Sequence, residues 1–309
     1  MTASNTDTIS IEDRFIGCLL GLAVGDAVGA AVEFKPRGSF TPITDMVGGG
    51  PWSLTPGQWT DDTSMALCLA ESLITCNGFD AADQMRRYVR WWRDGHWSSK
   101  GNCFDIGNTT SAALSRFEHD GNPYAGSTDP KTAGNGSLMR LAPAVLAAWP
   151  SSSLADLWAA DSSRTTHGAP SAVASCRVYA AILVAALNGA GRDELLAAAA
   201  DLPLTHAGVR AAAQGAWRAK GVDQIRGSGY VVEALEAALW CFAQTSSYRD
   251  AVLTAANLGE DADTTAAIVG QLAGAFYGAE AIPAAWREQT TQRAAIEQMA
   301  LQLLALQPT

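Results

Sequence analysis

The sequence lacks several patterns that mark large classes of proteins. Its six cysteines are scattered without a CxxC pair and mostly lie in apolar helical contexts, which indicates reduced core thiols. The four histidines stand singly, whereas a helical phosphohydrolase of the His-Asp type needs paired histidines beside aspartates. The N-terminus has no basic stretch followed by an apolar core, so we expect no signal peptide. We also expect no apolar run as long as a membrane span.

Positive charge is scarce as well. Lys and Arg number 21 against 31 Asp and Glu, which gives a formal net charge of −10. Such an excess of negative charge disfavours attachment to anionic membranes and non-specific binding to nucleic acid. A nucleotide-like substrate stays compatible with it, because bound cations can reverse the field locally. We expect a cytoplasmic monomer without a membrane partner.

Helical signals dominate what the sequence does contain. Residues 11–309 show neither βαβ alternation nor a solenoid repeat, so we predict a single all-α domain after a flexible N-terminus over residues 1–10. The loop of residues 35–57, rich in Gly and Pro, has room for a short strand near residues 41–47. Helices are predicted over residues 11–31, 62–75 and 80–93. One helix follows residues 103–110 and ends near 118, another starts near 137 and continues past 143, and a third opens at 170. Further helices are predicted over residues 192–200, 205–220, 229–243, 247–257, 263–277 and 290–307.

Two acidic clusters, far apart in the sequence, carry the first functional signal. They combine threonine hydroxyls with paired aspartates, in Thr60, Asp61 and Asp62 and again in Asp261, Asp263 and Thr264. If they meet, their carboxylates share one place, which is prohibitively costly unless two divalent cations balance the charge. Ligands made only of hard oxygens favour Mg²⁺ or Mn²⁺ over Zn²⁺. The alternative is two ordinary helix starts with acidic caps.

A stripe of glycines indicates how the clusters could be brought together. In a helix, glycines spaced by four residues leave one face bare, at a cost of about 1 kcal/mol each relative to Ala. We therefore expect another backbone to approach that face, in a helix with a matching stripe. Asp26, beside the first stripe, either supports the site from behind or caps a neighbouring helix. The two stripes are Gly17, Gly21, Gly25 and Gly29, and Gly270, Gly274 and Gly278.

Several other positions have both a structural and a functional explanation. Glu33 ends a predicted helix, where a lone glutamate is usually solvated. Asp105 lies just before a helix start, and the sequence favours a capping role over a carboxylate held free for chemistry. The turn of residues 134–137 exposes backbone N–H groups at a predicted helix start, a weak signal for an anion or ribose. A structural role is favoured for His167.

Taken together, these motifs resemble the ADP-ribosylglycohydrolase family, and most of all its dinitrogenase-reductase-activating branch. The resemblance runs from about Phe15 to Trp286 and implies an orthogonal all-helical bundle with a two-metal cleft. The motifs that carry it, in order, are GLAVGDAVGAAVEF (21–34), PGQWTDDTSMAL (56–67), FDIGNTT (104–110), AGNGSLMRLAP (133–143), TTHGAP (165–170), SGYVVEALEAALW (228–240) and NLGEDADTTAAIVGQLAGAFYG (257–278).

The resemblance also implies roles for individual residues. Asp105 and Glu33 match carboxylates that act in catalysis in different branches of the family. Glu260 occupies a position that varies between glycine and an acidic residue. The two ions, Mg²⁺ or Mn²⁺, would be held by Thr60, Asp61, Asp62, Asp261, Asp263 and Thr264. The ADP-ribose pocket would be lined by Asn135, Gly136, Ser137, His167 and Tyr230.

The implied reaction is hydrolysis of the bond between ADP-ribose and a modified protein side chain, with oxocarbenium character at the sugar. The branch resemblance favours ADP-ribosyl-arginine as substrate and ADP-ribose as product. Serine-linked ADP-ribose, O-acetyl-ADP-ribose and modified nucleic-acid bases remain open. A catalytically silent ADP-ribose-binding protein is the alternative from another class, and the presence of both TDD and DADT argues against it.

Overall fold

The computed structural model describes residues 9–306, and every regular element within that range is a helix. The β-type pairings in the same range are isolated bridges, so the predicted all-α fold is confirmed. Residues 1–8 of the predicted flexible N-terminus lie outside the described range. The α-helices are α1 (Ile11–Gly29), α2 (Asp61–Cys76), α3 (Ala81–Asp94), α4 (Asn108–Asp120), α5 (Ala142–Ala148), α6 (Ser152–Thr166), α7 (Pro170–Leu187), α8 (Arg192–Leu195), α9 (Ala207–Ala213), α10 (Val231–Gln244), α11 (Tyr248–Ala256), α12 (Ala262–Tyr277), α13 (Ala284–Gln289) and α14 (Arg293–Leu304).

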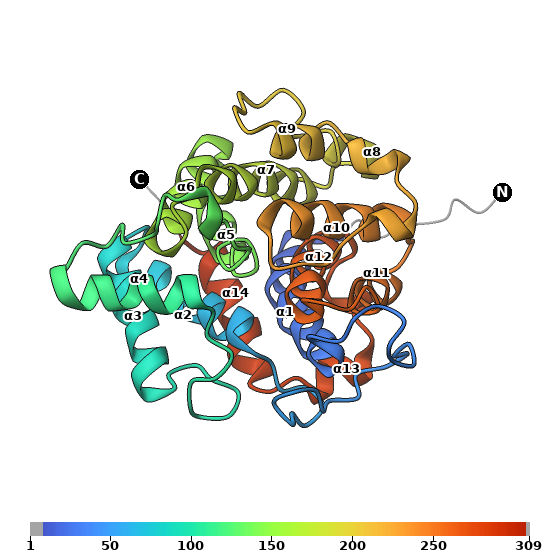
Figure 1. The fold of residues 1–309 in the computed structure, drawn as a ribbon, viewed down its shortest axis with the longest axis horizontal. Helices are drawn as coiled ribbons and strands as arrows, with labels where there is room; N and C mark the ends of the chain where they lie inside the picture. Colours follow the sequence, from blue (N-terminus) through green and yellow to red (C-terminus); the bar gives the residue numbers. More distant parts are fainter. Residues whose placement is uncertain (1–8, 307–309) are drawn as a thin grey trace.

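Helices α1 and α12 lie side by side at the centre, and most other helices surround them (Figure 1). The glycine stripe explains this close packing. A Cβ added to Gly25 would lie 2.2 Å from the backbone oxygen of Ala266, and one on Gly21 would lie 2.4 Å from that of Gly270. Only glycine permits such an approach, so the predicted pairing of these two helices is confirmed.

Two helical segments correct the expectation about long apolar runs. Ile11–Val32, with a mean hydropathy of 2.0, and Pro170–Leu187, with one of 1.6, are long and apolar enough to cross a membrane by length and composition. However, 94% of the apolar window in the first segment is buried inside the protein. Its apolar character therefore matches its central place in the fold, where it contacts other helices on all sides.

Some local predictions were wrong, and tertiary contacts explain why. Residues 41–47 form no strand; the side chain of Asn257 instead binds both the N–H and the carbonyl of Ile43, at 2.9 Å each. The helix expected from residue 137 begins only at Ala142, whose N–H donates to Gln271 Oε1 at 2.9 Å. In both places a distant side chain satisfies the backbone, which no local pattern reveals.

Other differences concern helix boundaries. Helix α6 was not predicted, although Ser151 caps it by accepting from the N–H of Leu154. The helix expected over residues 290–307 begins only at Arg293, because Gln292 before it adopts a left-handed conformation, and α13 ahead of it was not predicted. Gly278 is not part of the stripe; its φ of +82° ends α12, and glycine tolerates that angle best.

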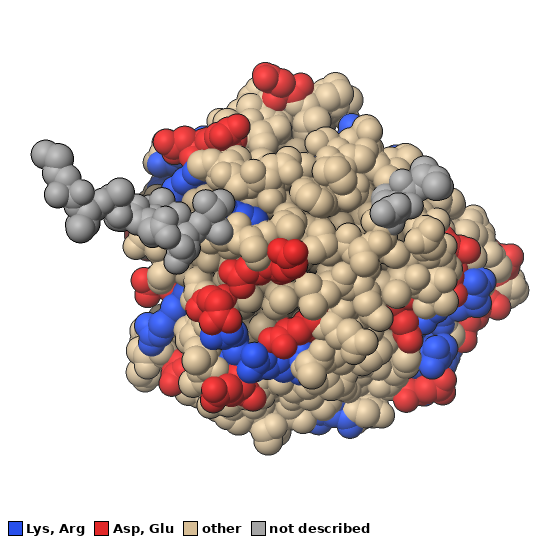
Figure 2. Space-filling model, turned by 180° about the vertical axis from the view of Figure 1, so that it is seen from behind, with Lys and Arg blue, Asp and Glu red and all other residues tan. Residues whose placement is uncertain are grey.

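The face seen in Figure 2 carries acidic and basic side chains in small neighbouring groups, between wide uncharged areas. Within the described part of the protein, ion pairs join some charged residues, for example Arg287 and Glu280 at 2.7 Å. Among the residues drawn in colour, this face has no continuous basic surface of the kind that binds nucleic acid non-specifically.

Candidate active site

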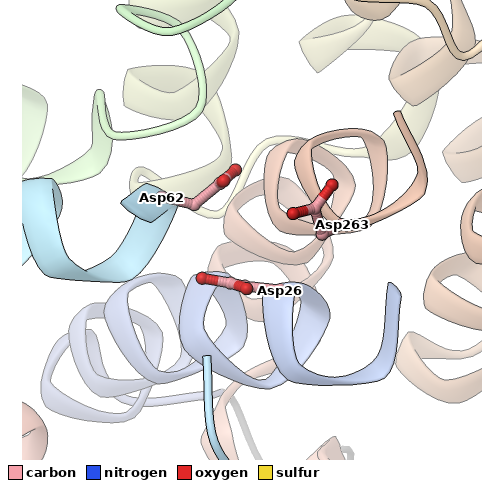
Figure 3. Close-up of side chains that lie close together, drawn as sticks. All are labelled: Asp26, Asp62 and Asp263. Carbon is pink, nitrogen blue, oxygen red and sulfur yellow. The ribbon is translucent and has the colours of Figure 1, made fainter. Parts of the chain in front are cut away.

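The two acidic clusters meet at the N-terminal ends of α2 and α12, as the sequence predicts. Thr60 Oγ1 lies 3.2 Å from Oδ2 of Asp62 and 3.2 Å from Oδ2 of Asp263, which is 203 positions away along the chain. Thr264 Oγ1 lies 3.4 Å from the same oxygen of Asp62. Figure 3 shows the carboxylates of Asp62 and Asp263 facing one another above Asp26 of α1. The close packing of α1 against α12 thus places two helix ends at one point.

Asp26 fills both of the roles that the sequence left open. Its carboxylate accepts from the N–H of Thr60 at 2.9 Å and from the N–H and hydroxyl of Thr63 at 3.1 and 2.6 Å. These bonds satisfy donors at the start of α2 that the helix itself leaves free. One oxygen of Asp26 also lies within 4.8 Å of oxygens of Asp62 and Asp263. The central helix therefore fixes the orientation of the acidic end of α2.

A second group of carboxylates extends the site toward the surface. Oxygens of Glu33, Asp105 and Asp263 lie within 4.8 Å of one another, and the indole of Trp52 donates to Glu33 at 2.8 Å. Asp105 does not cap α4, contrary to the explanation that the sequence favoured. The N-cap of that helix is Gly107, whereas Asp105 has a φ of +62° and lines the cleft.

Burial and mutual repulsion dominate the electrostatics of this group. Burial, followed by the charge of Asp105, raises the pKa of Glu33 to about 9. Burial, followed by Asp26, raises the pKa of Asp105 to about 8. For Asp61, Asp62 and Asp263, burial is again the largest cause of a pKa well above the usual value. Among the described residues, no Lys or Arg side chain lines the cleft to compensate.

The residues present fit bound cations. Oδ1 of Asp62 and Oδ1 of Asp263 are buried and have no hydrogen-bond partner among the described residues. Buried acceptors are rarely left unpaired, and a carboxylate oxygen is also an electron-pair donor to a metal. These two oxygens, from the two different helix ends, could therefore hold metal ions.

The carboxylates lie at one side of a cleft of about 900 Å³. The turn of Gly134, Asn135 and Gly136 and the start of α4 also line the cleft. Asn135 donates to Asp261 at 2.7 Å, so this turn contacts the second acidic cluster directly. A cleft with carboxylates at one end and backbone N–H groups beside it can accept a sugar attached to an anionic group.

His167 lies beneath this turn. A Cβ on Gly136 would lie 2.8 Å from its ring, so only glycine lets the turn rest on the imidazole. Burial, followed by the charge of Arg140, lowers the pKa of His167 to about 3, and the ring is neutral at physiological pH. Thr166 Oγ1 lies 2.8 Å from its Nδ1. The neutral ring supports the floor of the cleft.

The remaining two predicted pocket residues do not line the cleft. Ser137 is buried beside it and accepts from the hydroxyl of Ser163 at 2.9 Å. Tyr230 is the N-cap residue of α10, and its backbone pairs with Gly134 while its side chain is 39% exposed. Both support cleft-lining segments through neighbouring residues, and their roles in binding stay predictions.

Sequence reasoning missed Trp52 and Phe34, both of which line the cleft. Trp52 lies in a loop without periodicity, where no local pattern distinguishes it. A conspicuous aromatic residue beside a Gly run in a long loop was the one available signal, because such loops often carry functional side chains.

Comparison with known proteins identifies the family. The sequence model of the family described as ADP-ribosylglycohydrolase matches residues 7–309. The chain belongs to the ADP-ribosylglycohydrolase family. Within this family, the chain is 46% identical to the ADP-ribosylarginine hydrolase Tri1 of Pseudomonas putida over 298 residues, which cover 96% of this chain and 79% of the relative.

Further ADP-ribosylglycohydrolase relatives extend this comparison. The ADP-ribosyl-[dinitrogen reductase] glycohydrolase of Rhodospirillum rubrum is 34% identical over 90% of each chain. A solved structure described as an ADP-ribosylglycohydrolase-related protein complex is similar with a TM-score of 0.86 and 45% identity, covering 96% of this chain and 98% of that chain. The human ADP-ribosylhydrolase ARH3 is more distant, at 25% identity over 89% of this chain and 88% of its own.

Proposed function

We propose that this protein is a metal-dependent hydrolase that releases ADP-ribose from modified arginine side chains of proteins. The observation that carries the proposal is the meeting of two acidic helix ends, with an unpartnered carboxylate oxygen on each, at the side of one cleft. The arginine linkage is supported by relatives at 46% and 44% identity that are named ADP-ribosylarginine hydrolase. We further propose that the protein acts as a cytoplasmic monomer.

The proposed cofactor is a pair of divalent cations, Mg²⁺ or Mn²⁺. The two acidic clusters offer carboxylate and hydroxyl oxygens at the meeting point, and such hard donors are the ligands that both ions prefer. When bound, such ions neutralise the carboxylates and orient the sugar hydroxyls and a water. The residues that would hold them are Thr60, Asp61, Asp62, Asp261, Asp263 and Thr264.

The chemistry of the chain's own residues follows from the carboxylates nearer the surface. A water oxygen bonds to the anomeric carbon of the distal ribose, and the bond from that carbon to the guanidine nitrogen breaks, with its electron pair going to nitrogen. The proton that the water loses passes through Asp105 or Glu33 to the departing guanidine. The Trp52 indole holds Glu33 in place for this transfer through its 2.8 Å hydrogen bond.

The cleft also accounts for recognition of the rest of the substrate. ADP-ribose carries a diphosphate, which needs N–H donors because no Lys or Arg side chain among the described residues lines the cleft. The start of α4 has no side-chain cap, so its first N–H groups are free to donate to an anion. The turn over His167 offers less, because the N–H groups of Gly134 and Asn135 already donate to the carbonyls of Thr132 and Gly229.

The test compares release of ADP-ribose from two peptides of equal sequence, one modified on arginine and one on serine, with Mg²⁺ or Mn²⁺ present. We expect metal-dependent release that is faster from the arginine peptide. Faster release from the serine peptide would overturn the linkage. Binding of ADP-ribose in a calorimeter without turnover of either peptide would identify a silent binding protein instead.

A further inference from the structure

Phe34 is a large aromatic residue that the fold leaves exposed at the mouth of the cleft. Its side chain is 63% exposed, whereas the preceding Glu33 is 3% exposed. Both residues line the same cleft. A single exposed apolar residue on a surface needs no explanation, but one at the entrance to a reactive site does.

The backbone at Phe34 is held in an unusual conformation. Its φ is +60°, which is uncommon for a bulky residue, and Glu260 opposite has a φ of +58°. The N–H of Phe34 donates to the carbonyl of Glu260 at 2.7 Å, and the N–H of Glu260 donates to the carbonyl of Lys35 at 2.8 Å. Strain of this kind persists only where the surroundings fix it, and it gathers at functional sites.

The segment that carries the ring therefore has little freedom. Gly259, beside the strained Glu260, has a φ of +71°, and a Cβ there would lie 2.5 Å from the carbonyl oxygen of Lys35. No larger residue fits between the backbone segments around Lys35 and Gly259. The two hydrogen bonds and this close contact fix the backbone of Phe34, and therefore the point from which its aromatic ring extends.

Its position in sequence assigns Phe34 to the reacting end of the cleft. The adjacent Glu33 is one of the carboxylates proposed to move the proton. Glu33 in turn accepts a hydrogen bond from Trp52 in the cleft. The uncapped N–H groups suited to the diphosphate lie on another segment, at the start of α4. At the reacting end, the part of the substrate that projects toward solvent is the side chain that leaves.

We propose that the ring of Phe34 stacks on the guanidinium group of the modified arginine and thereby selects arginine-linked over hydroxyl-linked ADP-ribose. The proposal rests on the function proposed above. A guanidinium group is planar, cationic and weakly hydrated, so it stacks well on an aromatic face. A serine-linked substrate offers neither charge nor plane at this place.

The experiment uses the variants Phe34→Ala, Phe34→Leu and Phe34→Tyr in the full-length protein with Mg²⁺ present. For the arginine-linked peptide, we expect Phe34→Ala and Phe34→Leu to raise KM roughly three- to thirtyfold and Phe34→Tyr to leave it near the wild-type value, as for the loss and retention of one cation–π contact. Leu301→Ala on α14 is the matched control, because Leu301 is also an exposed apolar residue but does not line the cleft.

Binding of the product separates this role from others. ADP-ribose lacks the guanidinium, so its Kd in a calorimeter should be the same for wild type and Phe34→Ala. An equal loss for ADP-ribose and for the peptide would place the ring on the nucleotide and overturn the proposal. Unchanged KM in Phe34→Ala would overturn it as well, as would an equal rise for the serine-linked peptide. If wild type itself fails to cleave the arginine peptide, the proposed function fails first.

Discussion

At the scale of the residue, the site combines charges that oppose folding with a histidine that must stay neutral. His167 lies 2% exposed under the glycine turn, and its pKa falls to about 3 because burial disfavours the charged ring. In the unfolded chain, the same histidine takes up a proton near its ordinary pKa of about 6.5. Folding is therefore coupled to the release of that proton at acidic pH.

The sign of this coupling gives a prediction for pH dependence. Between pH 6.5 and about 3 the unfolded state binds one more proton at this position than the native state, so the native state loses stability as the pH falls. The loss is at most about 1.4 kcal/mol per pH unit. We expect the free energy of unfolding of wild type, measured with denaturant between pH 7 and pH 4, to fall more steeply than that of His167→Asn. Parallel curves would contradict a neutral buried ring.

Single residues also mark the limit of sequence reasoning. The aspartates that meet at the two helix ends could be singled out because each cluster keeps Thr and Asp adjacent at a helix start. The orientation of Asp105 could not, since it depends on a left-handed backbone angle that turns the carboxylate into the cleft. Trp52 reaches Glu33 from an irregular loop, so its hydrogen bond has no signature in the order of residues.

At the scale of the element, the contact between α1 and α12 positions the acidic helix ends. The stripe from Gly17 to Gly29 could be recognised from its spacing alone, and so could the presence of a matching partner. Helix α6 could not, because it has many Ser and Ala residues and no strong apolar period, and its stability comes from packing against α5 and α7.

A substitution in the stripe tests this contact. Gly25→Ala would place a methyl group 2.2 Å from the Ala266 carbonyl oxygen, so the backbones must separate. We expect a loss of about 2–3 kcal/mol or more in the free energy of unfolding, as for other overpacked cores. Gly221→Ala is the matched control, because nothing lies within 4 Å of a Cβ there. Thermal melts of both variants would show the difference, and equal stability would contradict the close approach.

At the scale of the whole molecule, bound cations would connect two segments that lie about 200 residues apart in the sequence. The native state offers the assembled oxygen donors and the unfolded chain does not, so binding must stabilise the fold by mass action. At a metal concentration 100 times Kd, this contributes about 2.7 kcal/mol.

We therefore expect Mg²⁺ or Mn²⁺ to raise the melting temperature of wild type and EDTA to reverse the rise and abolish turnover. Asp62→Ala should remove both the metal-dependent rise and the activity while the metal-free protein melts no lower than wild type, since one buried repulsive charge is gone. Asp193→Ala, an exposed aspartate on α8, serves as the control. Full activity in EDTA would contradict the two-ion mechanism.

The pairing of the first long helix with one of the last has a consequence for synthesis in the cell. While the ribosome is still synthesising the segments between α1 and α12, α1 has already emerged, and the helix that packs against its glycine face does not yet exist. The site is therefore assembled only after α12 has been synthesised, and a chain that terminates before α12 exposes this apolar segment instead of forming the site.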